Sequence, residues 1–224
     1  MKRVVITGVG VISPLGTGVR SLIEGLESGR SAVCHMDEWS RYCGMNSHVA
    51  APAELRDEKK IPRQLRRSMG RMSIFAVQAA EQALADSCID LSDTGAGRTG
   101  CIIGSTTGSA ISISKAFETM LFEKNLSLLP ASMFFQCMSH TASMNVSQYL
   151  GLTGRVMATS AACASSLQAI GTGYELICGG MQDVLFCGGA EELHPSVTGS
   201  FDVVFATSSN PPFTASGSVS KPTV

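Results

Sequence analysis

Residues 156–166 read VMATSAACASS, in which a β-branched strand pattern ends in small residues and Cys163 stands at the start of a helical run. A thiol at a helix N-terminus lies at the positive end of the helix macrodipole, where backbone N–H groups stabilise a thiolate and can face an oxyanion. The small neighbours leave the sulfur accessible. A single cysteine is more often an inert core residue, but this strand-to-helix turn predicts that Cys163 is a nucleophile.

Strand and helix patterns alternate on both sides of this stretch. The predicted strands cover residues 4–7, 100–104, 156–159 and 184–187, and the predicted helices cover residues 20–26, 64–88, 113–124, 141–150 and 163–178. Residues 34–55 have no clean period and hold the only tryptophan. The order of elements therefore predicts an α/β fold.

The composition excludes several classes of protein. With 44% hydrophobic and 16% charged residues and a net charge of −1, the chain is too apolar for disorder and has no global basic field to attract nucleic acid or anionic lipid. The apolar run 4–15 is interrupted by Gly, Ser and Pro, unlike a secretory signal, and no run reaches the roughly 20 apolar residues of a membrane helix. We therefore expect a soluble, cytoplasmic protein that binds neither nucleic acid nor membrane.

The eight cysteines form no C-x-x-C pair, and no histidine stands at zinc-ligand spacing from them. We predict no metal site and expect most of the cysteines to be buried and reduced.

A second motif, Gly8-Val9-Gly10, follows the first predicted strand and could open a dinucleotide-binding loop. The sixth position is Ser13 instead of glycine, and Pro14 stands where a helix would begin. We predict a tight structural loop, with a nucleotide-binding α/β domain as the less favoured alternative.

The region around Cys163 resembles the nucleophile region of the β-ketoacyl-acyl-carrier-protein synthases. The resemblance includes Gly171, Gly173 and the run CGGAEE at 187–192, and it extends to residues 4–10, the Gly104-Ser105 loop and residues 200–202, all in the same order. Essentially the whole chain is covered. The stretch from Glu191 to Asp202 resembles the synthase I and II branch more than synthase III.

The resemblance implies a thiolase-like fold with two similar α/β halves in a five-layered α-β-α-β-α arrangement, working as a homodimer. This chain would supply mainly the first half, over residues 1–206 with an excursion at about 30–62, and residues 207–224 would form a loop or tail leading to the second half. The implied activity is an acyltransferase reaction. An acyl chain passes from acyl carrier protein to Cys163, malonyl-carrier loses CO₂, and the resulting carbanion attacks the acyl-enzyme, in fatty-acid or polyketide chain elongation.

The resemblance also implies the ligands and their residues. No dissociable cofactor is expected, because phosphopantetheine arrives on the carrier protein with the acyl and malonyl thioesters. The acyl chain would lie against Thr106, Thr107, Gly108, Met138 and Phe201.

A local basic cluster, KKIPRQLRR at residues 59–67, stands out on the otherwise neutral chain. The residues alone fit a solvated helix start and an anion-binding surface equally well. The resemblance implies that Arg63, Arg66 and Arg67 dock the acidic carrier protein, since guanidinium groups pair with carboxylate and phosphate in bidentate fashion.

The histidines depart from the family pattern. The family uses two histidines, in H-G-T-G-T-like and G-H-x-x-G-like contexts, and a lysine, all in its second half. The histidines here are His35, His48, His140 and His194, and none has such a context. We therefore expect a longer synthase, or a second polypeptide that supplies the other half and covers an otherwise exposed apolar face. We also expect that this chain alone cannot complete the reaction.

Two other functions remain open. A non-catalytic partner subunit of a polyketide-type synthase would share the fold, although such subunits usually lack the nucleophilic cysteine. A cysteine hydrolase would require a histidine of this chain beside Cys163.

Overall fold

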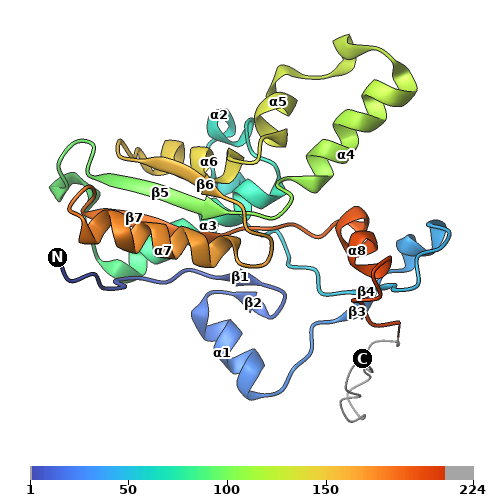
Figure 1. Ribbon diagram of the computed structural model, residues 1–224, viewed down its shortest axis with the longest axis horizontal. Coiled ribbons are helices and arrows are strands. Elements are labelled where there is room, and N and C mark those ends of the chain that lie inside the picture. Colours follow the sequence, from blue (N-terminus) through green and yellow to red (C-terminus); the bar gives the residue numbers. More distant parts are fainter. Residues whose placement is uncertain (1, 210–224) are drawn as a thin grey trace. The chain divides into compact units, whose positions relative to one another are not determined.

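A computed structural model describes residues 2–209 of the chain, which divides into two compact units (Figure 1). The first unit comprises Met1–Val11 and Leu55–Glu192, and the second comprises Ile12–Glu54 and Leu193–Val224. The boundaries expected from the sequence, 1–206 with an excursion at about 30–62, stay a prediction. Residues 210–224 of the expected tail lie outside the described residues.

A three-stranded parallel sheet forms the centre of the first unit. Strand β5 (Thr99–Gly104) lies between β6 (Val156–Thr159) and β7 (Val184–Gly189). Every residue of β5 is buried, as expected for a central strand covered on both faces. Gly104 pairs with both Thr159 and Gly189, so the carboxyl ends of the three strands meet at one edge of the sheet.

Helices cover both faces of this sheet (Figure 1). Because side chains alternate along a strand, Cys101 and Ile103 pack into one buried cluster with α3 (Arg71–Ser87) and α6 (Thr141–Leu150). Ile102 packs into a second cluster with Ala169 and Leu176 of α7 (Ser165–Cys178). The predicted α/β fold is confirmed, with strands β5, β6 and β7 and helices α6 and α7 close to their predicted bounds.

The helix predicted over residues 64–88 is broken into two. Helix α2 spans Arg63–Arg66 and α3 begins at Arg71. Gly70 lies against Ser109 so closely that a side chain at this position would collide with the Ser109 hydroxyl. This contact with a distant part of the chain ends the helical run, and a local pattern could not reveal it.

The remaining short helices of the first unit lie between these elements. They are η2 (Glu58–Lys60), η3 (Leu91–Asp93), α4 (Ala110–Glu118), the π-helical η4 (Thr119–Glu123), η5 (Leu126–Leu128) and α5 (Ala131–Cys137).

The buried strand predicted over residues 4–7 is wrong. The segment has no strand partner among the described residues, and Val5 and Ile6 are 62% and 83% exposed. It is instead tied to α3, where the backbone N–H of Val9 donates to the Asp86 carboxylate at 2.9 Å. Side chains at Gly8 or Gly10 would collide with backbone carbonyls of α3. Both glycines therefore serve close packing, in keeping with the structural loop predicted from the sequence.

The second unit has little regular structure. It contains the hairpin β1 (Ile12–Ser13) with β2 (Gly16–Thr17), the pair β3 (Cys34–His35) with β4 (Val49–Ala50), and helices α1 (Val19–Glu27), η1 (Asp37–Arg41) and α8 (Pro195–Asp202). Trp39 is buried. Asp202 joins the two sequence segments of this unit, because its carboxylate accepts from the backbone N–H of Asn46 at 2.7 Å and of Ser47 at 3.1 Å. Led by the Asn46 bond, these hydrogen bonds hold the pKa of Asp202 below its usual value.

The cysteines differ from expectation. All eight are free thiols, but only Cys101 and Cys178 are buried, whereas Cys34, Cys43, Cys88 and Cys163 are exposed. The prediction that most are buried is wrong. Separately, none of the helices formed by residues 2–209 has both the length and the apolar character needed to span a bilayer.

Candidate active site

Cys163 lies in a tight turn between β6 and α7. The backbone N–H of Ala164 donates to Ala161 O, and that of Ser165 donates to Ala162 O, both at 3.0 Å. Ala162 is left-handed, with φ 49°. For a residue with a Cβ this conformation costs roughly 1–2 kcal/mol, and such strain is tolerated where the surrounding structure fixes it.

The side chain of Ser165 fixes this turn from inside. Its hydroxyl is buried, accepts from the backbone N–H of Ala161 at 2.8 Å and lies 2.6 Å from Ala162 O. The hydroxyl of Thr159, the last residue of β6, donates to Ser165 O at 2.8 Å. The end of the strand and the start of the helix therefore hold Cys163 from both sides.

Cys163 itself is exposed, and α7 begins two residues after it, at Ser165. Cys163 therefore directly precedes the N-terminal end of a 14-residue helix, which is the positive end of the helix macrodipole. Elsewhere, burial raises the pKa of the Cys101 thiol to about 12 and that of Cys187 to about 11. These two thiols stay neutral near pH 7.

The segment that follows β5, residues 105–109, leaves the same edge of the sheet as the Cys163 turn, and we call it the 105–109 loop. The backbone N–H of Ser105 donates to Thr159 O at 3.2 Å, and Ser105 O lies 3.4 Å from the Ser165 hydroxyl. Thr106 and Thr107 are exposed, and the buried Gly108 is left-handed, with φ 75°.

The structure brings only part of the expected acyl-binding set together. A Cβ at Gly108 would lie 3.6 Å from Ser139 Cα, which places the 105–109 loop beside the residue that follows the half-buried Met138. Phe201 lies on α8 of the second unit and is 42% exposed. That these residues bind an acyl chain stays a prediction.

Two acidic residues at the end of β7 have roles that the sequence interpretation missed. The Glu191 carboxylate accepts from the backbone N–H of Thr106 at 2.7 Å and from the hydroxyls of Ser105 at 3.1 Å and Thr107 at 3.2 Å. The sequence does show two consecutive acidic residues shortly after an apolar strand pattern and two glycines. It does not show which groups these carboxylates bind.

The buried Glu192 points to two helix N-termini. Its carboxylate accepts from the backbone N–H of Met72, in the first turn of α3, at 3.0 Å and from that of Ile111, in the first turn of α4, at 2.6 Å. A negative charge at a helix N-terminus is favourable, and both N–H groups would lack an intrahelical partner.

The basic cluster is distributed around α2. Arg63 and Arg67 are exposed, whereas Arg66 is half-buried and donates to Glu58 O at 3.0 Å. Ile61 is buried and anchors the segment in the core. The structure therefore places Arg63 and Arg67 on the surface and gives Arg66 a structural contact.

The histidines lie in different parts of the chain. His140 directly precedes α6 in the first unit and is exposed. In the second unit, His35 lies 2.8 Å from the Asp37 carboxylate, His48 packs edge-on against His35, and His194 accepts from the backbone N–H of Ser196 at the start of α8.

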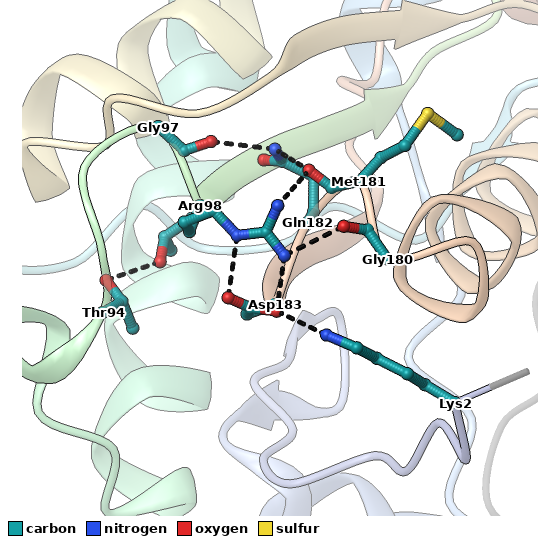
Figure 2. A network of polar contacts seen from close by, with 9 residues as sticks. Lys2, Thr94, Gly97, Arg98, Gly180, Met181, Gln182 and Asp183 are labelled. Carbon is teal, nitrogen blue, oxygen red and sulfur yellow. Dashed lines mark hydrogen bonds and ion pairs between the residues drawn. The ribbon is translucent and has the colours of Figure 1, made fainter.

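An ion network lies at the opposite end of the sheet (Figure 2). Arg98 precedes β5 and donates to both oxygens of Asp183, which precedes β7, at 2.8 and 2.7 Å. Lys2 contacts the same carboxylate at 3.1 Å, and the guanidinium also donates to Gly180 O and Met181 O just after α7. This network ties elements together at the amino ends of the strands, away from Cys163.

Comparison with known proteins gives one consistent family. Residues 1–220 match the family model described as "Beta-ketoacyl synthase, N-terminal domain". The chain is 32% identical over 208 residues to 3-oxoacyl-[acyl-carrier-protein] synthase 1 of Haemophilus influenzae, which covers 93% of this chain and 51% of that protein.

Solved structures agree with this match. A β-ketoacyl synthase from Burkholderia phymatum STM815 superimposes with a TM-score of 0.85 at 40% identity, covering 93% of this chain and 52% of that one. A type II PKS acyl-carrier protein in complex with its ketosynthase, bound to the hexaketide, gives a TM-score of 0.79 at 25% identity, covering 94% of this chain and 51% of that one. The chain spans about half the length of the relatives that it matches.

Proposed function

The chain belongs to the β-ketoacyl synthase family, and from that premise we propose that it carries the nucleophile of a decarboxylating condensing enzyme, with Cys163 as the acyl acceptor. The first step is thioester exchange. The Cys163 thiolate attacks the carbonyl carbon of an acyl thioester, a C–S bond forms, and the original C–S bond breaks to release the phosphopantetheine thiolate, which takes up a proton. The observation that supports this role is the exposed Cys163 on a fixed turn before α7.

The second step extends the chain. Malonyl-carrier loses CO₂, its carbanion attacks the acyl-Cys163 carbonyl, and the Cys163 thiolate leaves, so that β-ketoacyl-carrier is formed. The histidines that handle carboxylate loss and enolate charge in this family are not matched by the histidines here. The proposal therefore assigns this chain the acyl-transfer step, in fatty-acid or polyketide elongation.

The proposed partner is acyl carrier protein, which brings the acyl and malonyl thioesters on its phosphopantetheine. The solved relative that is described as a carrier protein in complex with its ketosynthase supports this partner. Arg63 and Arg67 are the proposed docking residues, with Arg66 beside them. Homodimer assembly and the need for no dissociable cofactor follow from the family resemblance, a cytoplasmic location is the expectation from the sequence, and all three belong to the same proposal.

Acylation of Cys163 tests the function directly. The chain is incubated with acyl-carrier protein, and its intact mass and peptides are measured. We expect one acyl group on Cys163, none in Cys163→Ser, and an unchanged yield in Cys88→Ser, which removes another exposed thiol. An unacylated wild-type chain would instead favour the non-catalytic partner subunit, and acyl label that persists in Cys163→Ser would show that another residue is the acceptor.

A further inference from the structure

The dipeptide Glu191-Glu192 holds the 105–109 loop at both of its ends. Glu191 accepts three hydrogen bonds from Ser105, Thr106 and Thr107, where the loop leaves β5. Glu192 accepts from the Ser109 hydroxyl at 3.2 Å and from the backbone N–H of Ile111, where the loop enters α4. The two acids therefore have different tasks, and only Glu191 contacts the exposed residues of the loop.

The bonds of Glu191 continue into the backbone of the loop. The Ser105 hydroxyl, which donates to Glu191, also accepts from the backbone N–H of the left-handed Gly108 at 3.0 Å. Hydrogen bonds to an ionised carboxylate are stronger than those between neutral groups. Because Thr106 and Thr107 are exposed, this carboxylate is the main restraint on their position that the described contacts provide.

The Cys163 turn does not depend on these bonds. Ser165 and Thr159 hold it, and Ser105 O meets the Ser165 hydroxyl only at the base of the loop. A change at Glu191 should therefore move the exposed loop residues Thr106 and Thr107 without moving the Cys163 turn.

We propose that Glu191 is a positioning residue that sets the length of acyl chain accepted at Cys163, by fixing Thr106 and Thr107, two members of the predicted acyl-binding set. This inference rests on the proposed function for its substrate class. The geometry that carries it, a carboxylate shared by three successive loop residues beside the cysteine turn, belongs to the first unit alone.

Alkylation with N-alkyl iodoacetamides tests the inference without the need for enzymatic turnover. Rates at Cys163 are measured by peptide mass spectrometry for a methyl and a dodecyl reagent, and the exposed Cys88 in the same chain is the internal reference. In the wild-type chain we expect the long-to-short rate ratio at Cys163 to differ from that at Cys88. In Glu191→Ala we expect the long-to-short rate ratio at Cys163 to change by about threefold or more, toward the ratio at Cys88.

Two conservative variants distinguish the loss of loop positioning from a general loss of structure. Glu191→Gln keeps an acceptor for the Thr106 N–H and an amide that the hydroxyls can accept from, so its ratio should stay near the wild-type value. Thr107→Val removes one donor only and should give a smaller shift in the same direction as Glu191→Ala. The matched control is Glu27→Ala, at the exposed end of α1, which should change nothing.

Amide hydrogen exchange gives a second readout, since loss of protection confined to residues 105–108 is expected in Glu191→Ala. A ratio at Cys163 equal to that at Cys88 in the wild-type chain, or a ratio unchanged in Glu191→Ala, would overturn the inference. Failure of Cys163 to accept an acyl group from carrier protein, with these alkylation ratios as expected, would count against the proposed function alone.

Discussion

Among single residues, Cys163 is the one whose environment predicts exceptional reactivity. Limiting iodoacetamide should label it first, at least several-fold ahead of any other thiol, because it combines exposure with a helix N-terminus. Cys101 and Cys187 should stay unlabelled near pH 7, because burial raises their thiol pKa values to about 12 and about 11. Peptide mapping after short reaction times gives the order.

The informative competitors are the other exposed thiols, Cys34, Cys43 and Cys88. Cys88 is the most useful of these, because it lies at the C-terminal end of α3, the opposite end of a helix macrodipole from the one that Cys163 precedes. Labelling of Cys88 before Cys163 would show that the helix field does not activate this nucleophile.

Asp183 makes the stability of the chain depend on pH. The hydrogen bonds from Arg98, then Lys2, hold the pKa of its carboxyl far below the usual range. A carboxyl group whose pKa is lower in the folded state stabilises the protein at pH values above its unfolded-state pKa of about 3.9. This stabilisation is lost as the pH falls from about 3.9 toward the folded-state pKa. Asp183→Asn should therefore lower the urea midpoint at pH 7, and the difference from wild type should shrink below about pH 4.

The matched control is Asp93→Asn, an exposed carboxylate in η3, which should have little effect at either pH. Urea unfolding is followed by circular dichroism at pH 7, 4 and 3. A difference in urea midpoint between wild type and Asp183→Asn that grows as the pH falls would contradict a lowered pKa of Asp183 in the folded state.

At the scale of elements, Glu192 joins two helices that are not neighbours in the sequence. Glu192→Ala leaves the buried N–H of Met72, the part-buried N–H of Ile111 and the buried Ser109 hydroxyl without this acceptor, and a buried unsatisfied group costs about 1–3 kcal/mol. We expect the free energy of unfolding to fall by roughly 2–4 kcal/mol. Denaturant unfolding measures this loss, with Glu175→Ala on the exposed face of α7 as the control. A loss no larger than that of the control would mean that water replaces the carboxylate.

The basic cluster gives a prediction about the partner. Arg63→Glu with Arg67→Glu should raise the apparent KM of Cys163 acylation by acyl-carrier protein, on the order of tenfold, because charge reversal at an interface rim opposes electrostatic encounter. A small acyl thioester without the protein should be unaffected. Added salt should weaken the wild-type advantage, since the Debye length is about 8 Å at physiological ionic strength.

Arg20→Glu, on the exposed face of α1, is the charge-reversal control, to be compared with Arg63→Glu and Arg67→Glu taken singly. An equal rise in the apparent KM for the carrier-bound and the small thioester would mean that Arg63 and Arg67 stabilise the fold and do not bind the carrier protein.

The elements that the sequence predicts best are those whose pattern is local. Strand β6 and helix α6 have the predicted bounds, because a short β-branched run and a regular apolar face are both visible in a short window. The break at Gly70 and the unpaired segment 4–7 depend on contacts between distant residues. A strand exists only when it has a neighbour, so its residues alone cannot establish it.

The same distinction, between local patterns and contacts of distant residues, applies to the candidate site. The position of Cys163 at a strand-to-helix turn was predictable, because strand, small residues and helix follow one another in the sequence. The left-handed Ala162 and the partners of Glu191 and Glu192 were not, since they arise from where the chain returns to the sheet edge. How Phe201 relates to Cys163 depends on the arrangement of the two units, and therefore stays a prediction.

We expect this chain to carry out the first step of the reaction, acyl transfer, and not the condensation that follows. Thioester exchange needs a thiolate and an oxyanion donor, which the proposed function assigns to the Cys163 side chain and to the backbone N–H of Cys163. Decarboxylation needs donors for the developing enolate, and each absent donor costs on the order of 3–4 kcal/mol, or about 10²–10³-fold in rate. Of the four histidines, His35, His48 and His194 belong to the second unit and His140 directly precedes α6. None stands in a matching motif, so we expect acylation without condensation.

Incubation of the 224-residue chain with acyl-carrier and malonyl-carrier, followed by mass spectrometry, separates the two steps. Acyl-Cys163 should accumulate while β-ketoacyl-carrier stays below detection, and malonyl-carrier should keep its carboxylate. The acyl yield itself should be modest, because the family resemblance places a second oxyanion donor outside this sequence. Steady formation of β-ketoacyl product would instead assign the decarboxylation to a histidine of this chain. In that case His140→Ala and His194→Ala would identify it, because only the variant that lacks the acting histidine would stop at acyl-Cys163.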